Sequence, residues 1–153
     1  MPSPAPSTLN LNTFQVLLRG FLGFVLGMIL GGCVNMGILI VGGKLVPMPA
    51  GVDINDIETI KAHINEYSVL QLSVPFAAHA GGTLVGAFVA ALLAITRHSR
   101  IALCSLIGLL FLAGGTLAVI MIPAPTWFNT IDLVCAYLPM AWLGYTLARL
   151  LRR

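Results

Sequence analysis

Five side chains in or beside the long apolar stretches of the sequence could carry chemistry. Polar and ionisable groups are costly at membrane depth, where they often mark ligand sites or proton paths. At 1.5 Å per residue of helix, Asn35, His79 and Tyr137 fall about 9 to 13 Å from the same side of these stretches. We therefore predict a small polar cavity with His79 as its titratable centre. Asp132 and Trp127 would lie just above it, which completes the predicted ligand-binding set: Asn35, His79, Tyr137, Asp132 and Trp127.

Each of these residues also has a simpler interpretation. His79 and Asn35 would then only hydrogen-bond between helices, each contributing about 0.6 kcal/mol to packing. For Asp132 we predict a cap at the N-terminus of the fourth apolar stretch, where its negative charge suits the helix dipole. Trp127 fits the belt of aromatic side chains that is typical of membrane interfaces.

The cysteines do not form a recognisable metal or redox motif. Cys33, Cys104 and Cys135 all lie in apolar stretches, without a CxxC pair, so we predict buried small hydrophobic residues. A membrane-embedded thiol enzyme is a further alternative, because Cys33 and Cys135 fall within about 6 Å of each other in depth. No HExxH, GxSxG or phosphate-binding loop occurs. The sequence therefore predicts no catalytic residue, no metal site and no cofactor.

The composition excludes a water-soluble particle. Of the 153 residues, 58% are hydrophobic and only 8% are charged, whereas soluble domains carry about 25% charged residues. So few charged side chains cannot cover the surface of a soluble protein, and the apolar surface must face lipid. Basic residues are not interleaved with aromatic ones on a polar surface, so we predict no nucleic-acid partner.

The sequence predicts a disordered cytoplasmic tail at 1–13 and a transmembrane domain at 14–153. Within this domain, four apolar segments reach the length of about 20 residues that a membrane-spanning helix requires. They cover residues 19–44, 70–95, 101–122 and 131–151. The predicted fold class is all-α: an integral membrane bundle of four transmembrane helices.

The charges on the connecting segments predict the orientation. Six of the eight Lys and Arg residues fall on one side of the predicted membrane, which the excess of basic residues marks as cytoplasmic. All five acidic residues fall on the other side. An even number of spans then places both termini in the cytoplasm. The basic residues of the cytoplasmic side are Arg19, Arg97, Arg100, Arg149, Arg152 and Arg153.

We expect the longest loop, residues 46–69, to lie on the extracytoplasmic side and to contain secondary structure. Asn55 followed by Glu58 resembles a helix-capping pattern. Apolar side chains then recur at helical spacing at Ile57, Ile60 and Ile64. We predict a short amphipathic helix that lies on the membrane surface or covers the bundle. The alternative is an ordinary loop helix with no ligand beneath it.

Two stripes of small residues predict close helix packing. Lipid provides no hydrophobic drive between helices, so backbones approach each other through small side chains. We expect the two stripes to meet each other or to form a homodimer contact. They consist of Gly23, Gly27 and Gly31 in the first segment, and Gly82, Gly86 and Ala90 in the second.

Several short stretches carry a family resemblance. They are VNMG at 34–37, VPMP at 46–49 with GVD at 51–53, AH at 78–79 with GTLVGAF at 82–88, PTWFN at 125–129 and YLPMAWLG at 137–144. In these stretches the chain resembles a group of small bacterial membrane proteins of unknown function. The resemblance implies a four-span fold and a multi-pass location in the bacterial inner membrane, and it implies no catalytic activity.

These observations favour a non-enzymatic membrane protein. We expect it to bind a ligand, a lipid or a partner protein through the polar layer and the glycine-rich helix faces. Its predicted partners are the lipid bilayer, a second copy of itself or another membrane protein. A small transporter or channel subunit, with His79 and Asn35 along the path, is the alternative. It would need a polar route that continues to the cytoplasmic side.

Overall fold

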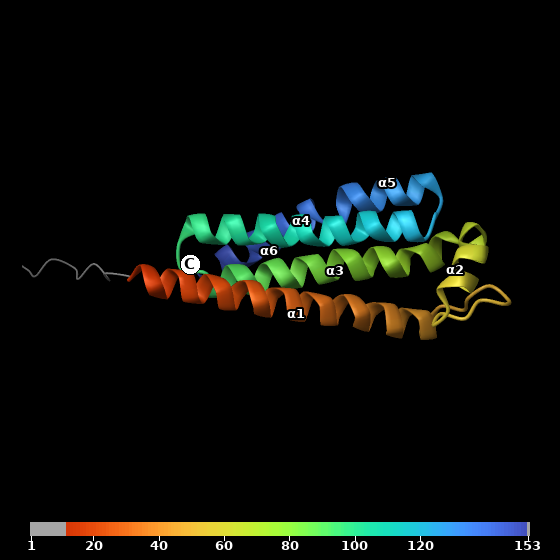
Figure 1. The fold of residues 1–153 in the computed structure, drawn as a ribbon, viewed down its shortest axis with the longest axis horizontal. Helices are drawn as coiled ribbons and strands as arrows, with labels where there is room; N and C mark the ends of the chain where they lie inside the picture. The colour runs from red at the N-terminus through yellow and green to blue at the C-terminus, as the bar shows by residue number, and fades with distance from the viewer. Residues whose placement is uncertain (1–11, 153) are drawn as a thin grey trace, which may run out of the picture.

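The computed structural model describes residues 12–152, which form helices and connecting turns without any β-strand (Figure 1). This confirms the all-helical fold class. Four stretches are long and apolar enough to cross a membrane: α1, α3, α4, and α5 together with α6. The elements are α1 (Thr13–Leu45), α2 (Ile57–His63), the 3-10 helix η1 (Ile64–Glu66), α3 (Val69–Leu93), α4 (Arg97–Met121), α5 (Thr126–Cys135) and α6 (Leu138–Leu150).

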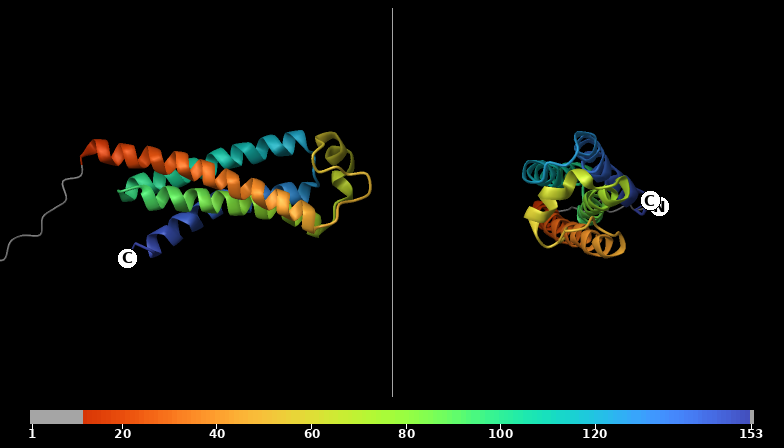
Figure 2. Two further views of the ribbon diagram at one scale, coloured as in Figure 1. Left: turned by 90° about the horizontal axis from the view of Figure 1, so that it is seen from below. Right: turned by 90° about the vertical axis from the view of Figure 1, so that its right-hand side faces the viewer.

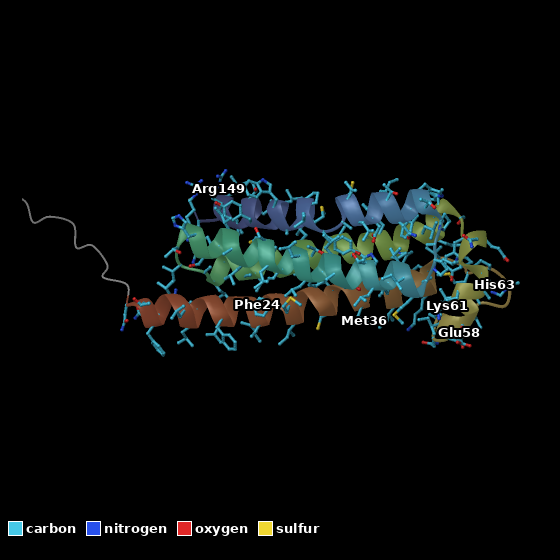
Figure 3. All side chains as sticks on the ribbon, turned by 45° about the horizontal axis from the view of Figure 1, so that its top comes forward. Phe24, Met36, Glu58, Lys61, His63 and Arg149 are labelled. Carbon is cyan, nitrogen blue, oxygen red and sulfur yellow. The ribbon has the colours of Figure 1, made fainter. Side chains whose placement is uncertain are left out.

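The two ends of the bundle differ in character. α2 and η1 cross one end, which we call the loop end (Figures 1 and 2). The start of α1, the turn between α3 and α4 and the end of α6 lie at the opposite end, which we call the arginine end. Figure 3 shows Glu58, Lys61 and His63 at the loop end and Arg149 at the arginine end. The charged side chains are thus separated by the apolar length of the bundle.

α1 and α3 pack through their glycines. A Cβ atom added at Gly27 would lie 2.5 Å from the carbonyl oxygen of Gly86, and one at Gly31 would lie 2.7 Å from that of Gly82. These distances leave no room for a side chain, so the two backbones are in direct contact. The two small-residue stripes therefore meet each other within one chain. The facing residues are Gly23, Gly27 and Gly31 on α1, and Gly82, Gly86 and Ala90 on α3.

The loop helix covers the loop end of the bundle. The N-cap of α2 is Asp56, whose side chain accepts a hydrogen bond from the Glu58 amide, so the capping role predicted for Asn55 is wrong. The Asn55 side chain instead donates to Asp53 Oδ1 at 3.1 Å. Buried Ile64 packs in a cluster with residues of α3 and α5. The predicted amphipathic helix is therefore present between α1 and α3, and its apolar side faces the bundle.

The last membrane-length stretch is broken in the middle. α5 ends at Cys135, α6 begins at Leu138, and Tyr137 between them has non-helical backbone angles of φ −116° and ψ −83°. Pro139 lies in the first turn of α6. Proline has no amide hydrogen, and its ring would clash with the carbonyl of Cys135 in a continuous helix. By contrast, α3 runs through Pro75 without interruption.

The cap predicted for Asp132 is wrong. α5 begins at Thr126, before the expected start at 131, and its N-cap position is Pro125, which provides no side-chain hydrogen bond. Asp132 consequently lies about 9 Å along the helix axis from Thr126, at 1.5 Å per residue. This depth places its carboxylate inside the bundle, where only 2% of the residue is exposed.

The packing of α1 on α3 leads to a first prediction. Gly27→Leu should lower the free energy of unfolding by about 1–3 kcal/mol, because the new side chain must separate two backbones in contact. Unfolding in mixed detergent micelles, followed by circular dichroism, measures this change. Gly32→Leu is the matched control on the same helix, because nothing lies within 4 Å of a Cβ added at Gly32. Equal destabilisation by both substitutions would contradict this packing.

Candidate functional site

A buried carboxylate joins three helical segments. Both Asp132 carboxylate oxygens lie 2.9 Å from His79 Nδ1 on α3. The Tyr137 hydroxyl, from the break between α5 and α6, donates a hydrogen bond to Asp132 Oδ2 at 2.9 Å. An unpaired ionised group would be very costly in this apolar setting. His79 and Tyr137 therefore supply the hydrogen bonds that allow Asp132 to be buried.

The imidazole of His79 is fixed by a second contact. Its ring stacks on the ring of Tyr137, with centroids 5.6 Å apart and an angle of 29° between the planes. On the same helix, the Thr83 hydroxyl donates to the His79 carbonyl oxygen at 2.8 Å. Asp132, His79 and Tyr137 thus form one connected group, which we call the Asp132 network.

A glycine on α4 provides the space for Tyr137. A Cβ added at Gly115 would collide with the Tyr137 hydroxyl. At the neighbouring Gly114, nothing lies within 4 Å of an added Cβ. Position 115 must therefore lack a side chain if the tyrosine is to reach Asp132.

The Asp132 network lies at the inner end of a cavity of about 420 Å³. This cavity occupies the loop-end half of the bundle, between segments 36–43 of α1, 71–79 of α3, 115–122 of α4 and 128–132 of α5. The loop between α1 and α2 also lines it, together with residues of α2 and η1. Most of the lining is aliphatic or aromatic, and the polar or phenolic side chains are few: Asn55, Tyr67, Gln71, His79, Asn129 and Asp132.

The cover of the cavity is tied to α3. The Gln71 side-chain amide donates to the Pro47 carbonyl oxygen at 2.6 Å and so joins the loop to the helix. Gln71 also belongs to a reciprocal capping box with Ser68 at the start of α3. Tyr67, just before this cap, is partly buried, which raises the pKa of its phenol. The phenol therefore keeps its proton, and remains a hydrogen-bond donor, at neutral pH.

Of the five predicted ligand-binding residues, His79, Asp132 and Tyr137 come together. Asn35 packs against Gly82 at the contact of α1 with α3, and it does not line the cavity. Trp127 is 47% exposed, and its ring meets Phe128 edge to face at 6.0 Å. Phe128 lines the cavity, and Trp127 does not.

The cysteines show no paired arrangement. Cys33 and Cys135 are both exposed on the bundle surface, whereas Cys104 is buried. Their helices, α1 and α5, make no contact with each other. The geometry thus gives no support to thiol chemistry between Cys33 and Cys135. Within residues 12–152, no group of three or more His, Cys, Asp or Glu side chains is arranged to hold a metal ion.

Sequence reasoning missed four polar residues of the cavity: Asn55, Tyr67, Gln71 and Asn129. One signal was available, because Ser68 followed three residues later by Gln71 is a capping-box pattern. That pattern would have fixed the start of α3 and placed Gln71 beside the loop. The Asn129 side chain donates to the Ala124 carbonyl oxygen at 2.9 Å, a contact that no sequence pattern indicates.

The hydrogen bonds determine what the network can do chemically. When Asp132 is ionised it has no proton to donate, so His79 Nδ1 must carry the shared hydrogen. In the neutral imidazole, Nε2 is then a hydrogen-bond acceptor. Within the described part of the chain, His79 forms side-chain hydrogen bonds only through Nδ1. Of the side chains described, no buried nitrogen or oxygen lacks a partner, so Nε2 is accessible from the cavity that His79 lines. The site therefore offers one strong acceptor at the inner end of an apolar space.

Comparison with protein-family models, with curated proteins and with solved structures finds no match to this chain. The interpretation of the site therefore rests on its own geometry.

Removing the Tyr137 hydroxyl should destabilise the protein. Tyr137→Phe should lower the free energy of unfolding by about 0.6–1.7 kcal/mol, the range measured for hydrogen bonds within membrane proteins. Tyr145→Phe is the control, because Tyr145 is also buried and packs against the ring of Trp142 instead of donating to a buried carboxylate as Tyr137 does. Detergent unfolding of both variants checks this. A loss of stability as large in Tyr145→Phe would show that the hydrogen bond is not responsible.

The space at position 115 gives a second test of the network. Gly115→Ala should displace Tyr137 and lower the free energy of unfolding by about 1–3 kcal/mol. Gly114→Ala should instead be neutral, or stabilising by about 0.5–1 kcal/mol, because alanine favours a helix over glycine. The two adjacent substitutions add the same methyl group. If Gly115→Ala were tolerated as well as Gly114→Ala, the tyrosine would not occupy the described position.

Proposed function

We propose that the protein binds an amphipathic small molecule within the membrane. The observation that carries this proposal is the cavity of about 420 Å³, which is mostly apolar and has the Asp132 network at its inner end. Ligand pockets typically have volumes of about 300–1,000 Å³ and an apolar lining with a few placed polar groups. A ligand with an apolar body and one polar group matches this distribution.

The polar group of the ligand is a hydrogen-bond donor. With Nδ1 donating to an ionised Asp132, His79 Nε2 accepts a hydrogen bond from the cavity side. A hydroxyl or amine on the ligand satisfies this acceptor.

Lipid is the source of the ligand. The lining includes Met36 and Ile40 of α1, and these side chains are 56% and 48% exposed on the outside of the bundle. Figure 3 labels Met36 on α1. Side chains that line the cavity on α1 are thus also exposed on the lipid-facing surface, whereas residues of α2 and η1 line its loop end. An apolar molecule dissolved in the bilayer would enter between α1 and α4.

The location follows from the distribution of charge. With the arginine end in the cytoplasm, the excess of basic residues obeys the positive-inside rule, and the cavity opens in the outer half of a bacterial inner membrane. The resemblance to small bacterial membrane proteins supports the same location. Self-association, or association with another membrane protein, stays a prediction.

Transport across the membrane has less support. The cavity reaches no deeper than His79 on α3 and Gly115 on α4. Beyond this level, the glycine contacts bring α1 and α3 together, and Ile107 of α4 is fully buried. This packing leaves no polar route through the described part of the chain.

Photolabelling tests the proposed binding. A long-chain alcohol that carries a diazirine would be added to vesicles containing the protein, and labelled peptides would be mapped by mass spectrometry. We expect labels on cavity-lining segments of α1, α3 and α4. Ala118→Trp should reduce this labelling at least about tenfold by filling the space, and His79→Leu should reduce it about tenfold by removing one buried hydrogen-bond acceptor.

The matched control for the cavity is Ala113→Trp. Ala113 lies on the same helix as Ala118 but is exposed, and it does not line the cavity. Equal labelling of the wild type and all three variants would refute the proposal. Labels confined to lipid-facing side chains, such as Leu117 and Ile120, would do the same.

A further inference from the structure

Two arginines converge on the carbonyl groups of the two residues that follow α3, Ala94 and Ile95. Arg100 of α4 donates from Nε to the Ala94 oxygen at 3.1 Å and from Nη2 to the Ile95 oxygen at 2.9 Å. Arg152, which follows α6, donates from Nη1 to the same Ala94 oxygen at 2.9 Å. Because both guanidinium groups bind one oxygen atom, two positive charges are held side by side.

A third arginine faces the same place. Gly23 of α1 packs on the Ala90 backbone and on Leu93. Residues four apart lie on the same face of a helix, so Arg19 lies on the face of α1 that packs on α3. The pKa of Arg152 is lowered by partial burial and by the positive charges of Arg100 and Arg19, which fits the proximity of all three.

No acidic side chain balances this cluster. Four of the five acidic residues of the chain lie between positions 53 and 66 at the loop end, and the fifth is Asp132, which is engaged by His79. The first turn of α4, where Arg100 lies, also contains no acidic residue. Among residues 12–152, the carbonyl dipoles at the end of α3 offset the charge. Each guanidinium has five N–H donors, and these contacts use two from Arg100 and one from Arg152.

We propose that Arg19, Arg100 and Arg152 form a binding site for the phosphate group of an anionic phospholipid. Guanidinium groups bind phosphate oxygens through paired hydrogen bonds. Arg100 and Arg152 meet at one oxygen atom here, and the charge of Arg19 acts on Arg152. A lipid fits better than free phosphate, because Leu22 and Leu151 beside the arginines are exposed apolar side chains. The headgroup then neutralises the cluster, and the acyl chains cover these leucines.

Native mass spectrometry of the delipidated protein tests this site. Phosphatidylglycerol should bind at least about tenfold more tightly than zwitterionic phosphatidylcholine, because charge-assisted hydrogen bonds favour the anionic lipid. The double substitution Arg19→Gln with Arg152→Gln should abolish this preference. Arg97→Gln with Arg149→Gln is the matched control: it removes the same charge from two exposed arginines and should keep the preference.

Each result decides the proposal. A wild type that binds both lipids equally, or an equal loss of preference in the two double variants, would overturn it. Displacement of phosphatidylglycerol by millimolar inorganic phosphate would assign the site to free phosphate and would overturn the lipid assignment. If the first double variant unfolds, Arg152→Gln alone replaces it, because Arg152 lies beyond the last helix and its loss should still weaken the preference.

Discussion

The burial of the Asp132 carboxylate is the constraint on which the rest of the structure depends. A charge in an apolar bundle is tolerated only if hydrogen-bonding partners replace its hydration. His79 must therefore lie at the same depth in the bundle as Asp132 and point toward α5. This requirement fixes the position of α3 along its axis relative to α5. Tyr137 must reach the same carboxylate, and Gly115 must leave space for its hydroxyl.

The break between α5 and α6 allows Tyr137 to reach Asp132. In a continuous helix, residues five apart project about 140° away from each other, at 3.6 residues per turn. The non-helical backbone at Tyr137 removes that separation and brings its hydroxyl to 2.9 Å from Asp132. Pro139 stabilises the break, because proline cannot continue a helix from the preceding turn. One local sequence feature thus determines the shape of the site.

Hydropathy and periodicity predicted the four long helices and the loop helix, because lipid requires long, regular apolar segments. Counting residues from the ends of the apolar segments placed His79 and Tyr137 at a similar depth. Depth does not show, however, in which direction around its helix a side chain points. Asn35 lies near that level and faces Gly82 instead. Asp132 was misjudged for a different reason: hydropathy placed the helix start after the polar Asn129 and Thr130, whereas α5 begins at Thr126.

Helix packing alone does not account for the Asp132 network. Hydrogen bonds within membrane proteins contribute about 0.6 kcal/mol on average, and a buried ionic pair is often replaced by apolar residues without loss of stability. The glycine contacts hold α1 against α3 without any polar group. The network also lies at the inner end of a cavity, and His79 Nε2 has no partner among the described residues. The ligand that we propose would supply this partner and would fill the space beside the network.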